Sequence, residues 1–441
     1  MLFLRYTIFL FLLTFLIFNL NINSLGSGDT IPARLLPLNV LSGQGLYFDN
    51  FVELLQKRFG TLYYFQQFDT HYISFFPILT GLLVLPFYLP FYIYLKLNNI
   101  NDINHLYTFS LGLQKLSASF LASISVVLFY LLIKKISSNN KISLVFALIF
   151  AFACQTFSVS SQALWQHGTA NLFMIISLIF LLKALEMNNF KKKVYYLLSI
   201  TFTLFSFWSR PNFFLWWTVI FFFIYRKEKS GKKLYVLFSL LGVTVLASYN
   251  FYFFHSIFGG YVSQLSTFSL TSLISNLSGL LFSPARGIIF YTPLFIFSFL
   301  SIVFLRQINR LPVKIKIIFY INYIYFILGL ILNSFWGVWW GGHSWGNRLL
   351  TDIAVSAIIL CYFFYINISN SWLKFIFYLF VIYSVTIQGI GVCCYSKSDW
   401  DSYPSNVDQD NIRLWDFIDN PILRSLKAGP DLRGFKMIPQ D

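Results

Sequence analysis

Residues 109–133 have the sequence FSLGLQKLSASFLASISVVLFYLLI and are followed at once by Lys134 and Lys135. An apolar run of about twenty residues is long enough for a helix to cross the roughly 30 Å hydrocarbon core of a bilayer. Similar runs recur along the chain, in which 57% of the residues are hydrophobic and only 11% are charged. Charged side chains are costly inside hydrocarbon, so this composition is typical of a chain built mostly of membrane-spanning helices.

The apolar runs predict an all-α fold, a polytopic transmembrane helical bundle of about eleven spans. Barrel strands are excluded because they would alternate apolar and polar residues over about ten positions. A further apolar stretch, residues 73–95, contains Pro77, Pro86 and Pro90. Proline breaks or kinks a helix, so we expect this stretch to dip into the membrane or to form part of a hairpin. The predicted spans are residues 2–20, 109–133, 142–163, 168–185, 194–209, 212–225, 233–254, 288–305, 315–334, 350–366 and 372–392.

Basic residues gather in four short connections between the predicted spans. The positive-inside rule places such connections in the cytoplasm. The N-terminus is then cytoplasmic, and the first long loop and the C-terminal tail are predicted to lie on the outer side of a multi-pass membrane protein. Glu186 and Glu228 are the two acidic residues expected on the inner face. The basic groups are Lys134, Lys135 and Lys141; Lys191, Lys192 and Lys193; Arg226, Lys227, Lys229, Lys232 and Lys233; and Arg306, Arg310, Lys314 and Lys316.

The predicted sidedness divides the net charge of +16 unequally between the two faces. Most acidic residues and all five histidines fall on the predicted outer side, so the inner face carries nearly the whole excess of positive charge. Such a balance indicates topology and attraction to anionic lipid headgroups, and it does not indicate nucleic-acid binding. We expect a transmembrane module, residues 1–392, with a first outer loop at 21–72. The tail, residues 393–441, is too short for a separate enzymatic domain and is expected to cover the outer mouth of the bundle.

Three predicted outer segments combine residue types that suit chemistry at a membrane surface. The first is Gly28-Asp29-Thr30-Ile31-Pro32-Ala33-Arg34, in a loop that continues through an amphipathic run at 46–59 to Asp69 and His71. The second is Ser283-Pro284-Ala285-Arg286-Gly287, and the third is Trp336-Gly337-Val338-Trp339-Trp340-Gly341-Gly342-His343-Ser344-Trp345-Gly346-Asn347-Arg348. Arginine at the mouth of a helix can hold a phosphate by bidentate contact. Tryptophans between glycines can form platforms for a sugar ring.

Other polar residues on the outer side are expected to be structural. Arg210-Pro211-Asn212 makes a tight turn, and a lone interfacial histidine such as His167 is more often structural than a ligand. The tail contains two acidic pairs, Asp399 with Asp401 and Asp408 with Asp410, in a polar stretch that includes proline. These pairs are expected to be solvated surface.

Taken together, the three outer segments and the helix count resemble the GT-C superfamily of integral-membrane glycosyltransferases, above all its protein mannosyltransferase and aminoarabinose-transferase branches. In that family an acidic residue of the first outer loop acts as general base or binds the acceptor, and the resemblance places Asp29 in this position. The donor is a sugar on a polyprenyl phosphate, held by basic residues near the outer surface, and the resemblance extends this role to Arg286 and Arg348. Many relatives have an Asp-Glu pair where this chain has Asp29-Thr30. A second carboxylate would therefore come from Asp69 or elsewhere.

The expected reaction is inverting transfer of a sugar from a polyprenyl-phosphate-linked donor to a glycan, lipid or protein acceptor on the outer face. Such a transfer needs a base for the acceptor hydroxyl and cations for the departing phosphate. No metal ligands and no certain cofactor are predicted, and a role for a divalent metal is left open. The expected site residues are Asp29 as base; Arg34, His71, Arg286, His343 and Arg348 for substrate and phosphate; and Asp69, Trp339, Trp340 and Trp345 for acceptor or sugar.

Three other functions are weighed against this one. A transporter or lipid flippase normally has ionisable residues at mid-depth in its spans, whereas Lys115 and Asp352 fall near predicted span ends. An O-antigen polymerase or ligase would also act outside on polyprenyl-linked glycans, and a large outer loop late in the chain would favour it. A nucleotide-sugar transferase usually needs an acidic metal-binding pair on the inner face, which the sequence does not offer.

Overall fold

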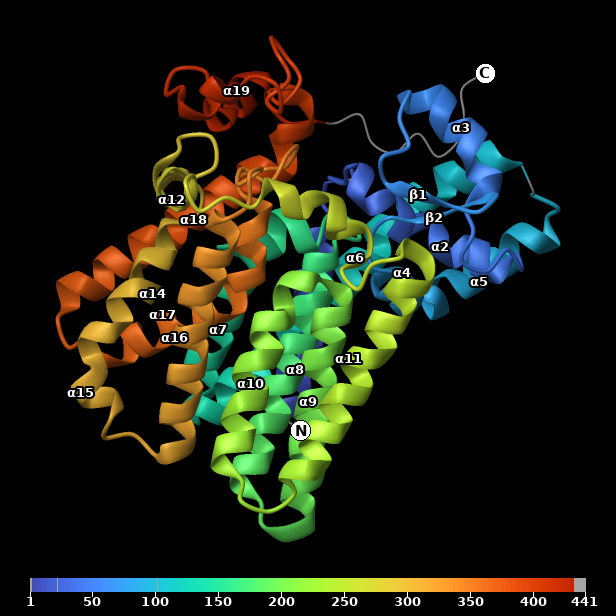
Figure 1. Cartoon of the computed structure of the whole chain (residues 1–441). Helices are drawn as coiled ribbons and strands as arrows, with labels where there is room; N and C mark the ends of the chain where they lie inside the picture. The colour runs from blue at the N-terminus through green and yellow to red at the C-terminus, as the bar shows by residue number, and fades with distance from the viewer. Residues whose placement is uncertain (1, 22, 101, 432–441) are drawn as a thin grey trace.

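The computed structural model describes residues 2–21, 23–100 and 102–431. Over these residues the fold is an all-α bundle, as the apolar runs predict, with a single two-stranded hairpin. Long helices form the body of the molecule, and many of the shorter elements gather at its upper end (Figure 1). Residues 432–441 of the predicted tail lie outside the described residues.

Most long helices coincide with predicted spans. The clearest case is α8, Gln166–Glu186, against a predicted span of 168–185. The long helices are α1 (Leu2–Phe18), α6 (Ile103–Ser137), α7 (Asn140–Phe152), α8, α9 (Asn189–Ser209), α10 (Phe214–Lys227), α11 (Lys232–Phe254), α16 (Val313–Ser334), α17 (Ala354–Asn367) and α18 (Ser371–Ser398).

Shorter elements connect and cap the long helices. The first loop contributes η1 (Gly28–Thr30), α2 (Ile31–Leu41), α3 (Asp49–Phe59) and the antiparallel hairpin of β1 (Phe65–Phe68) and β2 (His71–Ser74). The others are α4 (Leu79–Leu83), α5 (Leu85–Leu97), the π-helical η2 (Thr156–Ser160), η3 (Pro211–Phe213), η4 (Gly259–Thr267), α12 (Leu273–Phe282), α13 (Ile288–Tyr291), η5 (Pro293–Phe295), α14 (Ile296–Leu300), η6 (Ser301–Phe304), α15 (Leu305–Ile308), η7 (Arg348–Ile353), η8 (Asn411–Trp415) and α19 (Pro421–Ala428).

Six of the described helices are long and apolar enough to cross a membrane. They are α6, α8, α11, α16, α18 and the continuous segment of η7 with α17, Arg348–Asn367. Segments of this length and composition indicate an integral membrane protein. Apolar helices of 10 to 17 residues accompany them at Arg5–Phe18, Asn140–Phe152, Leu273–Phe282 and Pro293–Ile308.

Three predicted membrane segments are not single helices. The 142–163 segment leaves the α-helix after Phe152 and passes into η2, and the 288–305 segment is interrupted at Thr292 and Pro293. Proline removes a backbone donor and so interrupts the helix at this point. The two breaks are in contact, because Gln155 Nε2 donates a 2.9 Å hydrogen bond to the Thr292 hydroxyl. The proline-broken stretch 73–95 begins in β2 and then forms the two short helices α4 and α5.

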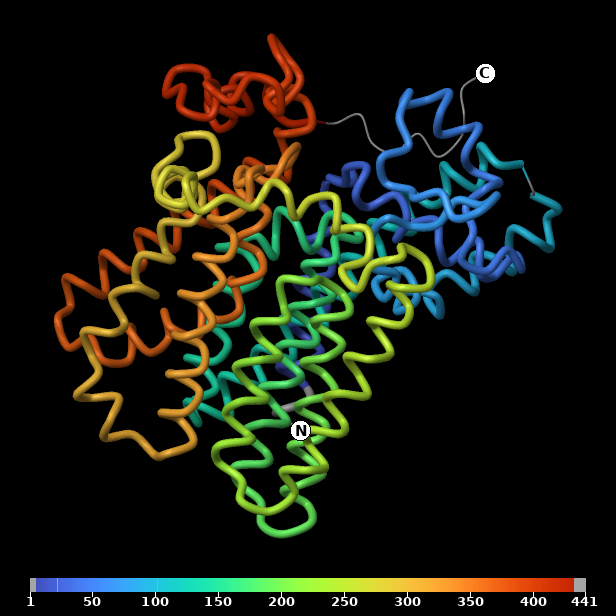
Figure 2. The backbone as a smooth tube through the Cα atoms, in the orientation of Figure 1, coloured from blue at the N-terminus to red at the C-terminus, as the bar shows by residue number. Residues whose placement is uncertain are grey.

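The predicted basic connections lie together at one end of the bundle. Figures 1 and 2 show the α8–α9, α10–α11 and α15–α16 connections at the lower end. Glu186, at the end of α8, pairs with Lys135 at 3.3 Å and with Lys314 at 2.7 Å, which brings the ends of α6 and α16 to the same place. Glu228 pairs with Lys192 at 2.6 Å. Both acids predicted for the inner face are thus neutralised by lysines of that face.

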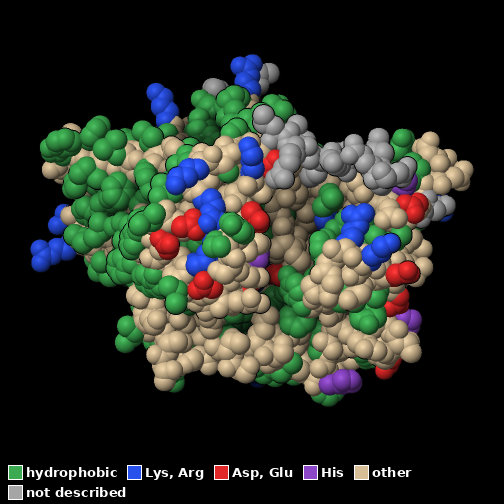
Figure 3. Space-filling model, turned by 90° about the horizontal axis from the view of Figure 1, so that it is seen from above, with side chains coloured by type: hydrophobic (Ala, Val, Ile, Leu, Met, Phe, Trp, Pro, Cys, Tyr) green, Lys and Arg blue, Asp and Glu red, His purple; other side chains and the backbone are tan. Residues whose placement is uncertain are grey.

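The opposite end of the bundle carries the hairpin, α3, α12 and the tail. Figure 3 shows this upper face from above, with acidic and basic side chains on it and hydrophobic side chains covering the left flank. Helix α18, which leads into the tail, packs closely against the 336–348 loop, because Gly391 leaves no space between that helix and the buried Trp345 indole. A methyl group at residue 391 would overlap the indole, whereas residue 389, on the same helix, has open space around it.

We expect Gly391→Ala to lower the free energy of unfolding by about 1–3 kcal/mol because the added methyl group overpacks the contact with Trp345. Gly389→Ala is the matched control, and it should leave stability unchanged or raise it by roughly 0.5–1 kcal/mol because glycine is unfavourable within a helix. Thermal unfolding of the purified protein in one detergent measures both. Equal midpoints for the two variants would contradict the packing described here.

Candidate functional site

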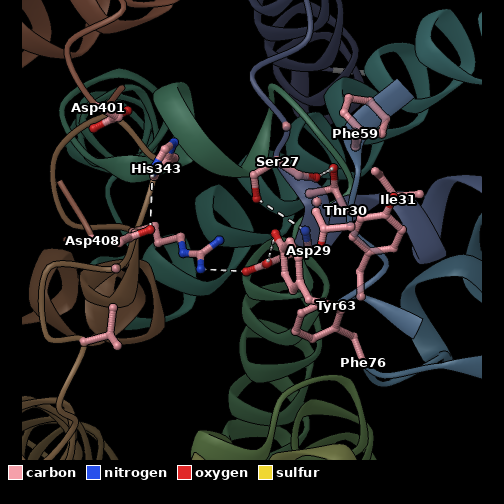
Figure 4. A pocket seen from close by; sticks show the side chains of 18 of the residues that line it. Ser27, Asp29, Thr30, Ile31, Phe59, Tyr63, Phe76, His343, Asp401 and Asp408 are labelled. Atoms are coloured by element: carbon pink, nitrogen blue, oxygen red, sulfur yellow. Dashed lines mark hydrogen bonds and ion pairs between the residues drawn. The ribbon is translucent and has the colours of Figure 1, made fainter. Parts of the chain in front are cut away.

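A cavity of about 1230 Å³ opens among the short elements at the upper end of the bundle. Figure 4 shows two of its sides: Ser27, Asp29 and Tyr63 lie on one, and His343 and Asp408 lie on the other. Its volume exceeds the roughly 300–1,000 Å³ of most small-molecule pockets, so it has room for a ligand with more than one part. The residues of the wall come from within the segments 24–34, 59–64, 107–114, 261–267, 336–349 and 395–408, together with Phe76 and Arg210.

Asp29 is held by two donors and stays open to the cavity. One carboxylate oxygen pairs with Arg348 Nη2 at 2.6 Å, and the other accepts a 3.2 Å hydrogen bond from the Tyr63 hydroxyl. The side chains of Asp29 and Arg348 keep 20% and 16% of their surface exposed. Ser27 caps η1 by accepting a hydrogen bond from the Asp29 amide. The carboxylate is therefore oriented by its neighbours without being enclosed by them.

Gly28 allows the contact between Tyr63 and Asp29. A side chain at residue 28 would overlap the Tyr63 hydroxyl, so only glycine lets this ring approach the η1 backbone. Arg348 is fixed in a comparable way, because its guanidinium lies 4.5 Å from the ring centre of Trp165. Cation–π contact of this kind restrains an arginine without using its hydrogen-bond donors.

Arg34 does not pair with Asp29. Helix α2 turns Arg34 towards Tyr107, whose ring centre lies 4.6 Å from the guanidinium, and only 3% of the Arg34 surface is exposed. Its Nε and Nη2 atoms have no hydrogen-bond partner among the described residues. The same holds for Gln114 Oε1 and the Tyr64 hydroxyl, which also line the cavity. Buried charges are normally paired, so this part of the wall suits an anionic ligand.

A buried carboxylate anchors the cationic side of the cavity. Asp352 contacts His167 Nδ1 at 2.7 Å with one oxygen and Arg210 Nε at 2.7 Å with the other. Asn212 donates to the second oxygen at 3.3 Å. Arg210 itself lines the cavity, so the turn expected to be structural also contributes to the site. Asp352 lies on η7, as Arg348 does, so fixing one end of this short helix also fixes the other.

Arg286 lies behind the cavity and binds the tail. It is fully buried, pairs with Asp401 at 2.7 Å and donates to the carbonyl of Gly342 at 3.2 Å. Its guanidinium also lies 5.2 Å from the ring centre of Trp400. With its cation neutralised by Asp401 and no place in the wall, Arg286 joins the tail to the 336–348 loop.

The tail completes the wall opposite Asp29. His343 Nε2 lies 3.4 Å from Asp408 and 3.2 Å from Asn406 Oδ1, and Trp340 donates a 2.8 Å hydrogen bond to Asp408. Asp401 and Asp408, expected to be solvated surface, both line the cavity. No local pattern marks them, because their partners Arg286 and His343 lie far away in the sequence.

Besides Arg286, four other predicted site residues lie away from the cavity wall. His71 is on β2, where it pairs with Asp49 at 2.6 Å, and Asp69 occupies the hairpin turn with a positive φ of 50°. Trp339 packs against Gly279, and Trp345 packs against Gly391. Of the tryptophans in the third segment, Trp336 and Trp340 are the two that line the cavity.

No group of three or more His, Cys, Asp or Glu side chains among residues 2–21, 23–100 and 102–431 is arranged to hold a metal ion. Comparison with protein-family models, with curated proteins and with solved structures gave no match to this chain. The function is therefore argued from the geometry and chemistry of the cavity.

We expect the contact between the tail and His343 to depend on pH. The hydrogen bond with Asp408 raises the pKa of His343 above its ordinary 6.5, and the same contact lowers the pKa of Asp408 below its ordinary 3.8. The contribution of His343 is full below about pH 6.5 and is lost as pH rises through the raised value. The contribution of Asp408 is full above about pH 4 and is lost as pH falls through the lowered value.

Amide hydrogen exchange of residues 400–410, corrected for intrinsic rates, should therefore be slowest between about pH 4 and 6.5 and faster on either side. His343→Gln should remove the change on the alkaline side, because glutamine does not titrate. An unchanged alkaline profile in that variant would show that another group controls the tail.

Proposed function

We propose that this protein is an integral-membrane glycosyltransferase of GT-C architecture that transfers a sugar from a polyprenyl-phosphate-linked donor to an acceptor, with inversion at the anomeric carbon. The observation that carries the proposal is the Asp29 carboxylate, held by Arg348 and Tyr63 but open to a large cavity at one end of a bundle of apolar helices. The unpartnered Arg34 guanidinium in the same cavity supports an anionic donor.

The side of the membrane on which the cavity opens is inferred from the positions of the basic residues. The basic connections lie at the end of the bundle opposite the cavity, and the positive-inside rule assigns such connections to the cytoplasm. The cavity would then open on the outer face, where lipid-linked sugars are presented without a nucleotide. Eleven spans, with α4 and α5 dipping into the membrane from the outer side, would satisfy this arrangement.

In the proposed reaction, Asp29 accepts the proton of an acceptor hydroxyl while the hydroxyl oxygen attacks the anomeric carbon of the donor. The bond between that carbon and the phosphate oxygen breaks, and the lipid phosphate leaves with the electron pair. Attack from the face opposite the phosphate inverts the anomeric configuration. Arg348 and Tyr63 orient the base, and nearby guanidinium groups stabilise the charge that develops on the phosphate.

The contacts of each basic side chain decide which of them is suited to stabilise the leaving phosphate. Arg286 does not line the cavity and is paired with Asp401, and His343 contacts Asp408 on the tail side. Arg34 and Arg210 both line the cavity, and Arg34 has free donors. We therefore assign the phosphate to Arg34 first and to Arg210 second.

Transport or flipping of a lipid-linked sugar is the second candidate function. The buried cluster of His167, Asp352 and Arg210 favours it, because ionisable groups buried inside a membrane protein often mark a transport pathway. The two functions differ in their products. A transferase consumes the donor in detergent solution, whereas a flippase leaves it intact and moves it only across a sealed bilayer.

Asp29→Asn should abolish sugar transfer, with a loss of about a hundredfold or more, because an amide cannot accept the acceptor proton. The measurement is consumption of polyprenyl-phosphate-linked glucose, galactose, mannose and arabinose by the purified protein. Asp69→Asn is the matched control: it removes a carboxylate of the same loop that lies away from the cavity, and activity should remain. Wild-type rates in the Asp29 variant would disprove its role as base.

Arg34→Gln should raise the KM for the donor about tenfold or more, because it removes a buried cation that no described carboxylate neutralises. Arg58 contacts the same Tyr107 ring, at 4.7 Å, but it is exposed and lies away from the cavity wall. Arg58→Gln therefore serves as the control and should leave KM unchanged. Arg34→Gln also removes the cation–π contact with Tyr107, so thermal unfolding of both variants is measured to show that the change in KM belongs to folded protein. Equal KM values for the two variants would contradict the assignment.

A further inference from the structure

The tail side of the cavity has polar groups whose hydrogen-bonding capacity is only partly used. Asn406 Oδ1 accepts the backbone amide of Asp408 at 2.9 Å, which fixes the orientation of the Asn406 amide group. Its Nδ2 group has no acceptor among the described residues. Ser402 also lines this wall with its side-chain hydroxyl unbonded in the described chain, and Asp408 keeps 45% of its side-chain surface exposed.

The same contacts fix the protonation pattern of His343. Its Nε2 faces two acceptors, Asn406 Oδ1 and Asp408 Oδ2, so this nitrogen carries the hydrogen. Nδ1 is left without a partner in the described chain, as an acceptor in the neutral ring and a donor in the charged one. A ligand hydroxyl can satisfy either state, because a hydroxyl both donates and accepts.

Two indole side chains border these polar groups. Trp340 is held in place by its hydrogen bond to Asp408, and Trp336 is half-buried against Phe268, with ring centres 5.7 Å apart. Both line the cavity beside His343. Carboxylate, amide, imidazole and hydroxyl groups beside aromatic rings match the chemistry of a sugar, which offers closely spaced hydroxyls around an apolar ring face.

We infer that the wall formed by the tail and the 336–343 loop is a carbohydrate-binding subsite for the acceptor. This identification of the ligand as acceptor rests on the proposed function. Inverting transfer needs the acceptor on the side of the anomeric carbon opposite the leaving phosphate. The free cation, Arg34, belongs to the first-loop wall of the cavity, and Figure 4 shows His343 and Asp408 on the side opposite Asp29. The acceptor of the protein is therefore a glycan, or a sugar-bearing molecule, and not an unmodified protein or lipid.

The subsite is tested by saturation-transfer NMR of the purified full-length protein with methyl glycosides of glucose, galactose, mannose, arabinose and N-acetylglucosamine, in the absence of donor. At least one glycoside should bind, with a Kd on the order of millimolar. His343→Ala, Asp408→Ala and Trp336→Leu should each weaken binding about tenfold. Trp336 makes no hydrogen bond to the tail, so its variant reports on the sugar platform even where the other two loosen the tail.

Asp410→Ala serves as the matched control. It removes a tail carboxylate that contacts Ser405 and does not line the cavity, so this variant should bind the glycoside as the wild type does. The inference is overturned if no glycoside binds the wild type, or if Trp336→Leu binds as tightly as the wild type.

A competition arm separates acceptor from donor sugar. Polyprenyl-phosphate-linked glucose, galactose, mannose or arabinose is added to the glycoside-bound protein. Simultaneous binding supports an acceptor subsite, whereas displacement of the glycoside overturns it, because the wall would then hold the donor sugar. Glycoside binding requires no turnover, so it can succeed where the transferase assay fails, or fail where that assay succeeds.

Discussion

The buried carboxylate of Asp352 is the contact on which the cavity depends. It joins the start of α8 through His167, the turn after α9 through Arg210, and η7, on which it lies. Breaking a buried ion pair by removing one partner typically costs about 3–5 kcal/mol, because the remaining charge is left unpaired. Such a contact holds three helices at one relative position. Since η7 also begins with Arg348, the position of Asp352 sets the place at which a cation meets Asp29.

The helices themselves could be predicted because hydrophobic length alone defines them. The apolar runs at 168–185 and 233–254 became α8 and α11 with ends displaced by two residues or fewer. The breaks after Phe152 and at Thr292 could not be located, because they meet across the fold: the Gln155 side chain near one break donates to the Thr292 hydroxyl at the other. A sequence shows where proline can interrupt a helix, but it does not show which side chain of a distant segment contacts that break.

The candidate site was predictable in part, because the sequence shows individual charged residues but not their distant partners. The scarcity of charge in so apolar a chain singles out Asp29, and the GT-C resemblance adds Arg348; the structure brings the two side chains together. The nearer base, Arg34, is carried by α2 to the other side of the loop, where an aromatic ring replaces a carboxylate as its neighbour. Asp401 and Asp408 resembled solvated surface because their partners, Arg286 and His343, belong to segments far away in the sequence.

The arginines of this region differ in what neutralises them. Arg348 is paired with Asp29 and also contacts the Trp165 ring. Arg210 is paired with the buried Asp352, and the fully buried Arg286 is paired with Asp401. Arg34 alone among these four has guanidinium nitrogens in the cavity wall and no carboxylate partner in the described chain. An anion that enters the cavity would therefore meet an electrostatic gradient that points away from the tail and towards α2.

A cavity walled by the first loop, the 336–348 loop and the tail also has a consequence for biosynthesis. The ribosome delivers Asp29 and Arg34 early, Arg348 only after most of the helices have entered the bilayer, and Asp408 later still. During most of synthesis, the ionisable groups of the first loop therefore contact solvent or lipid headgroups and not their later neighbours in the cavity. An incomplete chain can insert its helices but cannot form the site, so the acid, the cation and the opposite wall come together only once translation has passed Asp408.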